Sequence, residues 1–64
     1  MIFGIVKNWN ISQGWGFIEG ADGNDYFLHI SNIRSGQVIV NNSRVKFDIS
    51  QGQRGPEAEN VTMY

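Results

Sequence analysis

Flat aromatic rings occur on a short segment whose residues alternate in type. In residues 15–19, Trp15 and Phe17 occupy the same alternate positions as Glu19. Successive side chains of a β-strand point to opposite faces of the sheet, so these three residues are expected to share a face. A carboxylate is costly to bury without a partner, which predicts that this face meets solvent and carries both rings with it. Exposed rings of this kind can stack on the flat faces of nucleobases.

A second segment repeats this arrangement. In residues 25–30, Asp25, Phe27 and His29 share the face opposite the apolar residues of the segment. The carboxylate and the imidazole again predict a solvent-facing side, so Phe27 is expected to be exposed. If the two segments pair as a hairpin across residues 20–24, their three rings and the imidazole form one patch. A contiguous exposed aromatic patch marks a binding site, unless a loop or a second subunit covers it.

The remaining polar residues do not form a pattern typical of an enzyme. The chain has one histidine and no cysteine, which argues against a disulfide framework and a structural zinc site. It shows no paired nucleophile and base, no cluster of metal ligands and no phosphate-cradling glycine loop. A stacking or edge-contacting role for His29 is favoured over a general base. We therefore expect no enzyme activity, no metal and no cofactor.

Length and charge limit the architecture and the partners of the chain. Sixty-four residues suffice for a single domain, residues 1–64, and a domain this small buries only about 60% of the surface of its unfolded chain. No signal peptide is visible, and no apolar run approaches the roughly 20 residues of a membrane span. The sequence thus predicts a cytoplasmic protein without membrane contact, and a monomer is favoured. The net charge of −1 predicts a weak attraction to phosphates.

Period-two segments bounded by turn residues run along the whole chain and predict an all-β fold. A short helical turn is expected at residues 31–33, and residues 50–56 are expected to be a loop because they are rich in turn residues. Closing five short strands into a barrel hides the apolar face and the edges. A five-stranded antiparallel oligonucleotide-binding (OB) barrel is favoured over an SH3-like barrel. The expected strands are residues 3–10, 15–19, 25–30, 44–49 and 60–64.

The first and fourth strands differ in how clearly they alternate. In the fourth, Val45, Phe47 and Ile49 are expected to face inward, between charged residues that face solvent. In the first, strict alternation from Lys7 would expose Trp9 beside the aromatic patch. A β-bulge near Trp9 would instead turn this ring inward. The pattern leaves both orientations open.

Four fragments of the chain match a known family in order and at nearly the family spacing. The sequence resembles the bacterial cold-shock proteins over essentially its whole length. The family's opening segment, its two RNA-binding motifs and its C-terminal segment correspond to Gly4-Ile5-Val6-Lys7-Asn8-Trp9-Asn10, Gln13-Gly14-Trp15-Gly16-Phe17-Ile18, Tyr26-Phe27-Leu28-His29-Ile30 and Arg54-Gly55-Pro56-Glu57-Ala58-Glu59-Asn60-Val61.

The resemblance implies an OB barrel that binds single-stranded RNA or DNA and acts as an RNA chaperone or in transcription antitermination. It implies base stacking at Trp15, Phe17, Phe27 and His29, with neighbouring contacts at Asn8 and Ile30. It also implies polar or ionic contacts at Lys7, Asn10, Asp25 and Arg54. From the residues alone, Asp25 is a base-edge acceptor, a partner for Lys7 or a plain surface carboxylate.

Departures from the family pattern make the expected platform smaller and less basic. Asn8 stands where the family has a stacking tryptophan, Ile30 where it has a phenylalanine, and Gln13 where it has a lysine. These departures support an alternative function, a protein-interaction or self-association module on the same barrel. The two functions differ in whether oligonucleotide competes with a protein partner for the patch.

Overall fold

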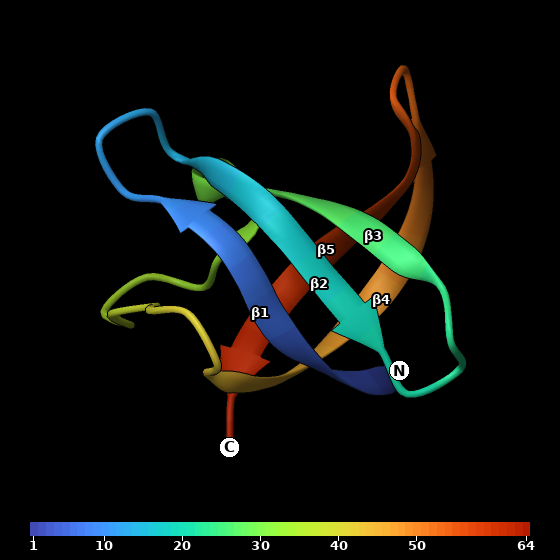
Figure 1. Ribbon diagram of the computed structural model, residues 1–64, viewed down its shortest axis with the longest axis horizontal. Coiled ribbons are helices and arrows are strands. Elements are labelled where there is room, and N and C mark those ends of the chain that lie inside the picture. The colour runs from blue at the N-terminus through green and yellow to red at the C-terminus, as the bar shows by residue number, and fades with distance from the viewer.

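The computed structural model describes residues 1–64 and shows a closed barrel in which the strands follow the order β1-β2-β3-β5-β4 around the axis (Figure 1). This confirms the predicted all-β barrel of five strands, which is consistent with the OB fold. A single short 3-10 helix, η1, follows β3, and no helix is long and apolar enough to cross a membrane. The elements are β1 Ile2–Asn10, β2 Trp15–Gly20, β3 Asp25–His29, η1 Ile30–Asn32, β4 Arg44–Gly52 and β5 Gly55–Met63.

One strand pair departs from the antiparallel pattern. The pairs β1–β2, β2–β3, β1–β4 and β4–β5 are antiparallel, whereas β3 and β5 run parallel. Strand directions cannot alternate all the way around a closed ring of five strands, so one neighbouring pair must be parallel. This pair closes the barrel where Phe27 lies opposite Glu57, and a bridge from Ile33 to Val61 extends it.

The interior of the barrel is filled by one apolar cluster. Its two aromatic rings, Tyr26 and Phe47, meet edge to face with centroids 5.2 Å apart. Gly4 lets β1 approach β2 closely, because a Cβ atom there would overlap Ile18 and the carbonyl oxygen of Glu19. The buried apolar residues are Val6, Ile18, Tyr26, Leu28, Ile39, Val45, Phe47, Ala58 and Val61.

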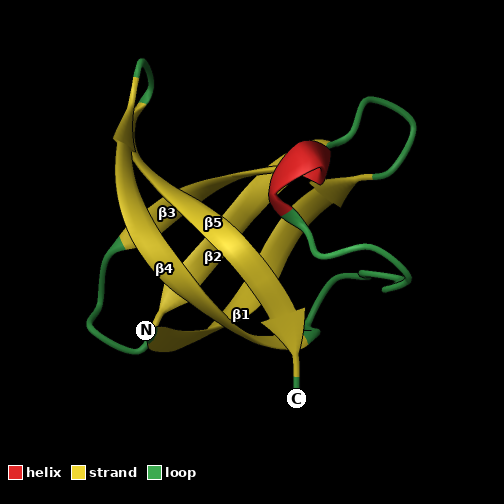
Figure 2. Ribbon diagram, turned by 180° about the vertical axis from the view of Figure 1, so that it is seen from behind, coloured by secondary structure: helices red, strands yellow, loops and turns green.

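The β4–β5 ribbon is longer than predicted. The predicted loop at residues 50–56 is wrong, because the strands continue to Gly52 and from Gly55, leaving only Gln53 and Arg54 as the turn. This part of the ribbon projects beyond the barrel (Figure 2). No core lies against either of its faces there, so alternation gives no signal. Ile49, predicted to face inward, pairs with the buried Ala58 where the ribbon begins to leave the barrel, and it is 43% exposed.

The chain after β3 leads away from the sheet through η1 (Figure 2). The strand ends at His29, and the helical turn begins at Ile30, one residue earlier than predicted. The long connection to β4 returns to the barrel through Ile39, which is buried in the core, and through Ser43, which is also buried. Ile30 therefore lies at the edge of the β2–β3 surface, where strand gives way to helix.

Candidate nucleic-acid interface

The β2–β3 hairpin places three rings next to one another on the outside of the barrel. Phe17 and Phe27 lie directly opposite in the register, with ring centroids 5.9 Å apart, and Trp15 lies 6.3 Å from Phe17 along β2. Both contacts are edge to face. Trp15 is 37% exposed and Phe17 is 38% exposed, while Phe27 is half-buried. The faces assigned from alternation are those that the structure shows for β2 and β3, except that Ile30, assigned to the inner face, lies in η1 and is 51% exposed.

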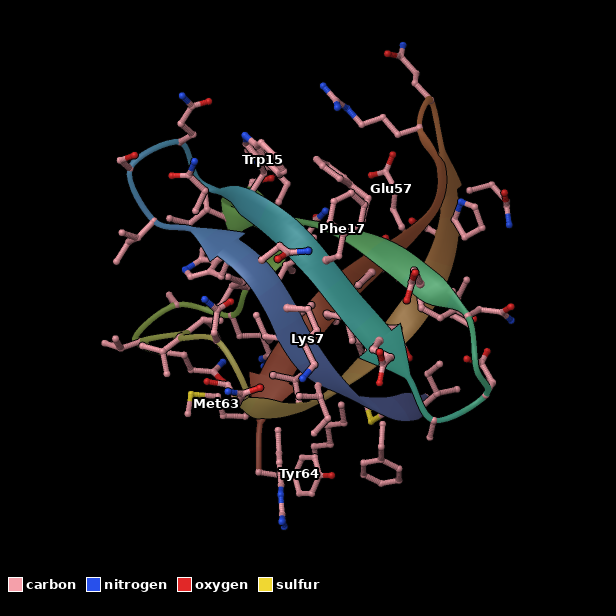
Figure 3. The ribbon with its side chains drawn as sticks, in the orientation of Figure 1. Lys7, Trp15, Phe17, Glu57, Met63 and Tyr64 are labelled. Carbon is pink, nitrogen blue, oxygen red and sulfur yellow. The ribbon has the colours of Figure 1, made fainter.

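The register of four strands aligns these residues in rows across the sheet. The central row runs Lys7, Phe17, Phe27, Glu57 from β1 to β5. Figure 3 shows Trp15, Phe17 and Glu57 toward the upper end of the barrel and Lys7 lower, on β1. Two rings thus lie between a cationic residue on one side and an anionic residue on the other.

A row on each side of the central row completes this surface. The Trp15 row contains Asn10, Trp15 and His29. The acidic row contains Ile5, Glu19 and Asp25, and both of its carboxylates are exposed. The two carboxylates lie directly opposite each other and carry the same charge as a phosphate. They therefore repel a phosphate at this end of the surface. An anion is therefore disfavoured at the acidic row and more favoured at the central row, near Lys7.

Arg54 covers part of the aromatic surface. Its guanidinium carbon lies 4.8 Å from the centroid of the Phe27 ring, in a cation–π contact. Arg54 occupies the turn between β4 and β5, which extends beyond the barrel past β3 (Figure 1). The contact explains why Phe27 is less exposed than Phe17 although the two rings share a row. An incoming base has to displace Arg54 or slide beside it to reach Phe27.

The structure resolves the orientation of Trp9 in favour of a bulge. Asn8 adopts a left-handed backbone with φ of 52°, and the β1–β2 register shifts between Lys7 and Asn10. Asparagine tolerates this conformation better than most residues. Trp9 is half-buried and packs against the core beneath Gly16, where a Cβ atom would lie 3.0 Å from Trp9 Cε3. Trp9 does not join the rings of β2 and β3, because the bulge turns it inward.

Two predicted polar residues of β1 make contacts within the protein. Lys7 Nζ donates to Asn42 Oδ1 at 2.9 Å, so Lys7 leans toward the loop before β4 and forms no salt bridge with Asp25. Asn10 Oδ1 accepts from Ser12 Oγ at 2.8 Å and from the Gln13 N–H at 3.2 Å. The side-chain oxygen of Asn10 therefore stabilises the turn into β2, and only the NH2 group of this side chain is free to bind a ligand.

His29 is exposed and fixed in orientation by its neighbour. Its Nδ1 accepts from the Ser31 N–H at 3.1 Å and lies 2.8 Å from Ser31 Oγ. A backbone N–H can only donate, so Nδ1 is an acceptor and the neutral ring carries its proton on Nε2. The Nε2–H group is thus presented to solvent beside Trp15, to which His29 is paired. Ile30 follows, 51% exposed.

The turn between β2 and β3 is held by hydrogen bonds that set the register of the hairpin. Asp22 accepts from the Asn24 N–H at 3.1 Å and from the hydroxyl of Tyr26. These bonds stabilise the carboxylate and lower the pKa of Asp22 below that of an ordinary aspartate, with the Tyr26 hydroxyl as the largest cause. The same bond raises the pKa of Tyr26. The turn thereby keeps Phe17 opposite Phe27.

Glu57 is a residue of this surface that the sequence did not single out. It lies on β5 beside Phe27, half-buried, and its neighbour Ala58 points into the core. The signal was available in the alternation of residues 57–59, but it could be read only if β5 began near Gly55. No group of three histidine, cysteine or acidic residues in the structure could hold a metal ion.

Comparison with known proteins places these features in one family. Residues 2–64 match the family model described as the 'cold-shock' DNA-binding domain. The chain is 45% identical over 65 aligned positions to cold shock protein ScoF of Streptomyces coelicolor, with 97% of each chain covered. It is 41% identical over 64 positions to the major cold shock protein of Streptococcus pyogenes, covering 97% of this chain and 96% of the relative.

A third relative agrees with these two. Cold shock protein 1 of Lactiplantibacillus plantarum is 43% identical over 60 positions, with 91% of each chain covered. The matches extend over nearly the full length of the chain and include β1, both strands of the ring-bearing hairpin and the β4–β5 ribbon. The chain therefore belongs to the cold-shock domain family, whose model describes a nucleic-acid-binding domain.

Proposed function

We propose that this protein binds single-stranded RNA and DNA by stacking bases on Trp15, Phe17 and Phe27. The observation that carries the proposal is the placement of these three rings, in mutual contact, on the outer face of the β2–β3 hairpin. Family membership supports it, since the matching model describes a DNA-binding domain. His29 and Ile30 extend the surface at the end of β3.

Stacking sets both the preference for single strands and the expected strength. A duplex hides the faces of its bases within the stack, whereas a single strand can splay them onto the rings. Each stacked base contributes about 1–3 kcal/mol, and ordering the strand removes much of the sum. We expect dissociation constants in the micromolar range or weaker, equivalent to about −8 kcal/mol at best. RNA and DNA should bind alike, because stacking does not require the 2′-hydroxyl.

The cellular role that fits this binding is RNA chaperoning or transcription antitermination in the cytoplasm. A protein that binds the unpaired form of an RNA and not the paired form shifts the equilibrium toward the open strand by mass action. Micromolar affinity makes this shift reversible, so the RNA can refold after release. Melting of an RNA hairpin in the presence of excess protein tests this role, and a lowered melting temperature is expected.

Fluorescence of Trp15 tests the binding directly. Trp9 also emits, so the variant Trp9→Phe is used to leave Trp15 as the only indole. We expect single-stranded oligothymidine and oligouridine to quench the emission of this variant in a saturable titration, with a matched duplex giving little change. Emission that stays flat with every single strand would contradict the proposal. A folded circular dichroism spectrum of the variant provides the control.

The alternative function, self-association through the same rings, gives a different result in one measurement. Sedimentation of the protein alone and with oligothymidine reports the mass of each species. A monomer that gains only the mass of the oligonucleotide supports nucleic-acid binding. A dimer that dissociates when the oligonucleotide is added supports self-association through the ring surface.

A further inference from the structure

The central row ends in a carboxylate beside the half-buried Phe27. Glu57 is the register partner of Phe27 across the parallel β3–β5 pair. Neighbouring strands lie about 4.8 Å apart, and partners in register point to the same face. Ala58 is buried, so Glu57 points outward with Phe27. Figure 3 shows Glu57 near Phe17, toward the β4–β5 ribbon.

The neighbouring strand leaves room for this carboxylate. A Cβ atom on Gly52 would overlap Glu57 Oε2 and Cδ and would lie 2.8 Å from Cγ. The Glu57 carboxylate therefore lies over Gly52 of β4 and has to rotate away from it to meet a base on Phe27. The Glu57 side chain forms no hydrogen bond and no salt bridge. The only salt bridge of the protein joins the Met1 amino group to Asp48. A half-buried carboxylate beside a stacking ring thus retains its capacity to accept hydrogen bonds.

We infer that Glu57 reads the edge of the base stacked on Phe27 and favours guanine. This inference rests on the proposed function, because it requires a base on Phe27. A carboxylate accepts two hydrogen bonds side by side and donates none. The Watson–Crick edge of guanine presents two adjacent donors, the ring N1–H and the amino group at C2. Guanine thus matches both oxygens of Glu57.

The other bases satisfy the carboxylate less well. Cytosine and adenine each present an amino group beside a ring nitrogen that accepts, so one Glu57 oxygen faces a lone pair. Thymine and uracil present a single N–H between two carbonyl oxygens, which repel a carboxylate. The expected order at this position is guanine first, cytosine and adenine next, and thymine or uracil last.

The remainder of the central row orients the nucleotide consistently with this reading. Lys7 lies at the opposite end of the row, separated from Glu57 by both phenylalanine rings. A phosphate is attracted toward Lys7 and repelled by Glu57, so the backbone lies on the β1 side and the base edge on the β5 side. Arg54, which covers Phe27 in the free protein, carries the opposite charge and can follow the phosphate or stack on the base.

Replacing guanine by hypoxanthine tests the inference with little change in stacking. Hypoxanthine keeps the fused ring and the N1–H of guanine and lacks the amino group. The probes are the alternating hexamers d(TG)3 and d(TI)3, where I is deoxyinosine, titrated by Trp15 emission in the Trp9→Phe background. A well-placed bidentate contact discriminates by about 1–3 kcal/mol, so we expect d(TG)3 to bind the protein about fivefold or more tightly than d(TI)3.

The variant Glu57→Gln should reduce this ratio to less than about twofold, while raising the affinity for oligothymidine. The matched control is Glu59→Gln, which makes the same charge change two residues along the outer face of β5. It should leave the ratio unchanged. Equal binding of both hexamers to the unmodified protein, or an equal loss of the ratio in both variants, would overturn the inference. Failure of every hexamer to quench would instead refute the proposed function.

Discussion

Two pairs of aromatic rings in this barrel share a geometry and differ in their surroundings. Phe17 and Phe27 meet edge to face at 5.9 Å on the outside of the sheet, and Tyr26 and Phe47 meet edge to face at 5.2 Å inside it. Tyr26 and Phe27 are adjacent residues of β3. The inner pair is sealed in the core, whereas Phe17 is 38% exposed. The same contact therefore stabilises the fold in one place and leaves ring faces accessible in the other.

The inner pair should give the largest change in stability. Phe47 is fully buried, so Phe47→Ala leaves a cavity and is expected to cost about 3–5 kcal/mol of the free energy of unfolding. Phe17→Ala removes an exposed ring and should cost about 1 kcal/mol or less. Thermal or urea unfolding followed by circular dichroism measures both. Similar costs for the two variants would show that the outer ring contributes to the core.

The outer pair should give the largest change in binding. Phe17→Ala is expected to weaken binding of oligothymidine by about 1–3 kcal/mol, or roughly fivefold to more than a hundredfold. Phe27→Ala should cost less, because a base that stacks on Phe27 first gives up the Arg54 cation–π contact. Trp15 emission in the Trp9→Phe background reports both. Unchanged affinity in both variants would contradict stacking on this face.

Replacing Arg54 should change the salt dependence of oligonucleotide binding more than it changes the free energy of unfolding. Arg54→Gln removes one cation from the ring surface, so the slope of log K against log salt should become shallower by about 0.7. Arg34→Gln is the matched control, since Arg34 is exposed in the loop after η1 and makes no cation–π contact, unlike Arg54. Titrations at several salt concentrations give the slopes. Equal slopes in the Arg54 variant and the unmodified protein would exclude a phosphate contact there.

The smallest effect is expected when the hydroxyl of Tyr26 is removed, and it concerns how stability depends on pH. Its bond to Asp22 lowers the pKa of Asp22, so the stability it provides is lost as the pH falls below about 4. It raises the pKa of Tyr26, so the same stability is lost as the pH rises above about 10. Tyr26→Phe keeps the ring against Phe47 and should flatten both ends of a plot of melting temperature against pH. An unaltered plot would show that the bond adds nothing to stability.

Sequence patterns predicted the barrel and the ring-bearing hairpin because β2 and β3 each have one face on the core and one in water. Alternation is strongest under that condition. It failed in the outer part of the β4–β5 ribbon, residues 50–56, where neither face meets the core, and the missed strand start also concealed Glu57. Trp9 could not be placed, because a bulge at Asn8 reverses the side to which every later residue points. Closure through β3 and β5 follows from the whole topology rather than from any local segment.

The two ends of the chain are held together at the end of the barrel away from the rings. Phe3 and Tyr64 meet edge to face at 5.1 Å, and the Met1 amino group lies 3.8 Å from Asp48. Figure 3 shows Tyr64 far from Trp15 and Phe17. A linker added after Tyr64 can therefore anchor the protein to a bead or sensor chip with its ring surface turned outward. Immobilised in this way, every molecule would offer the same face to a flowing oligonucleotide.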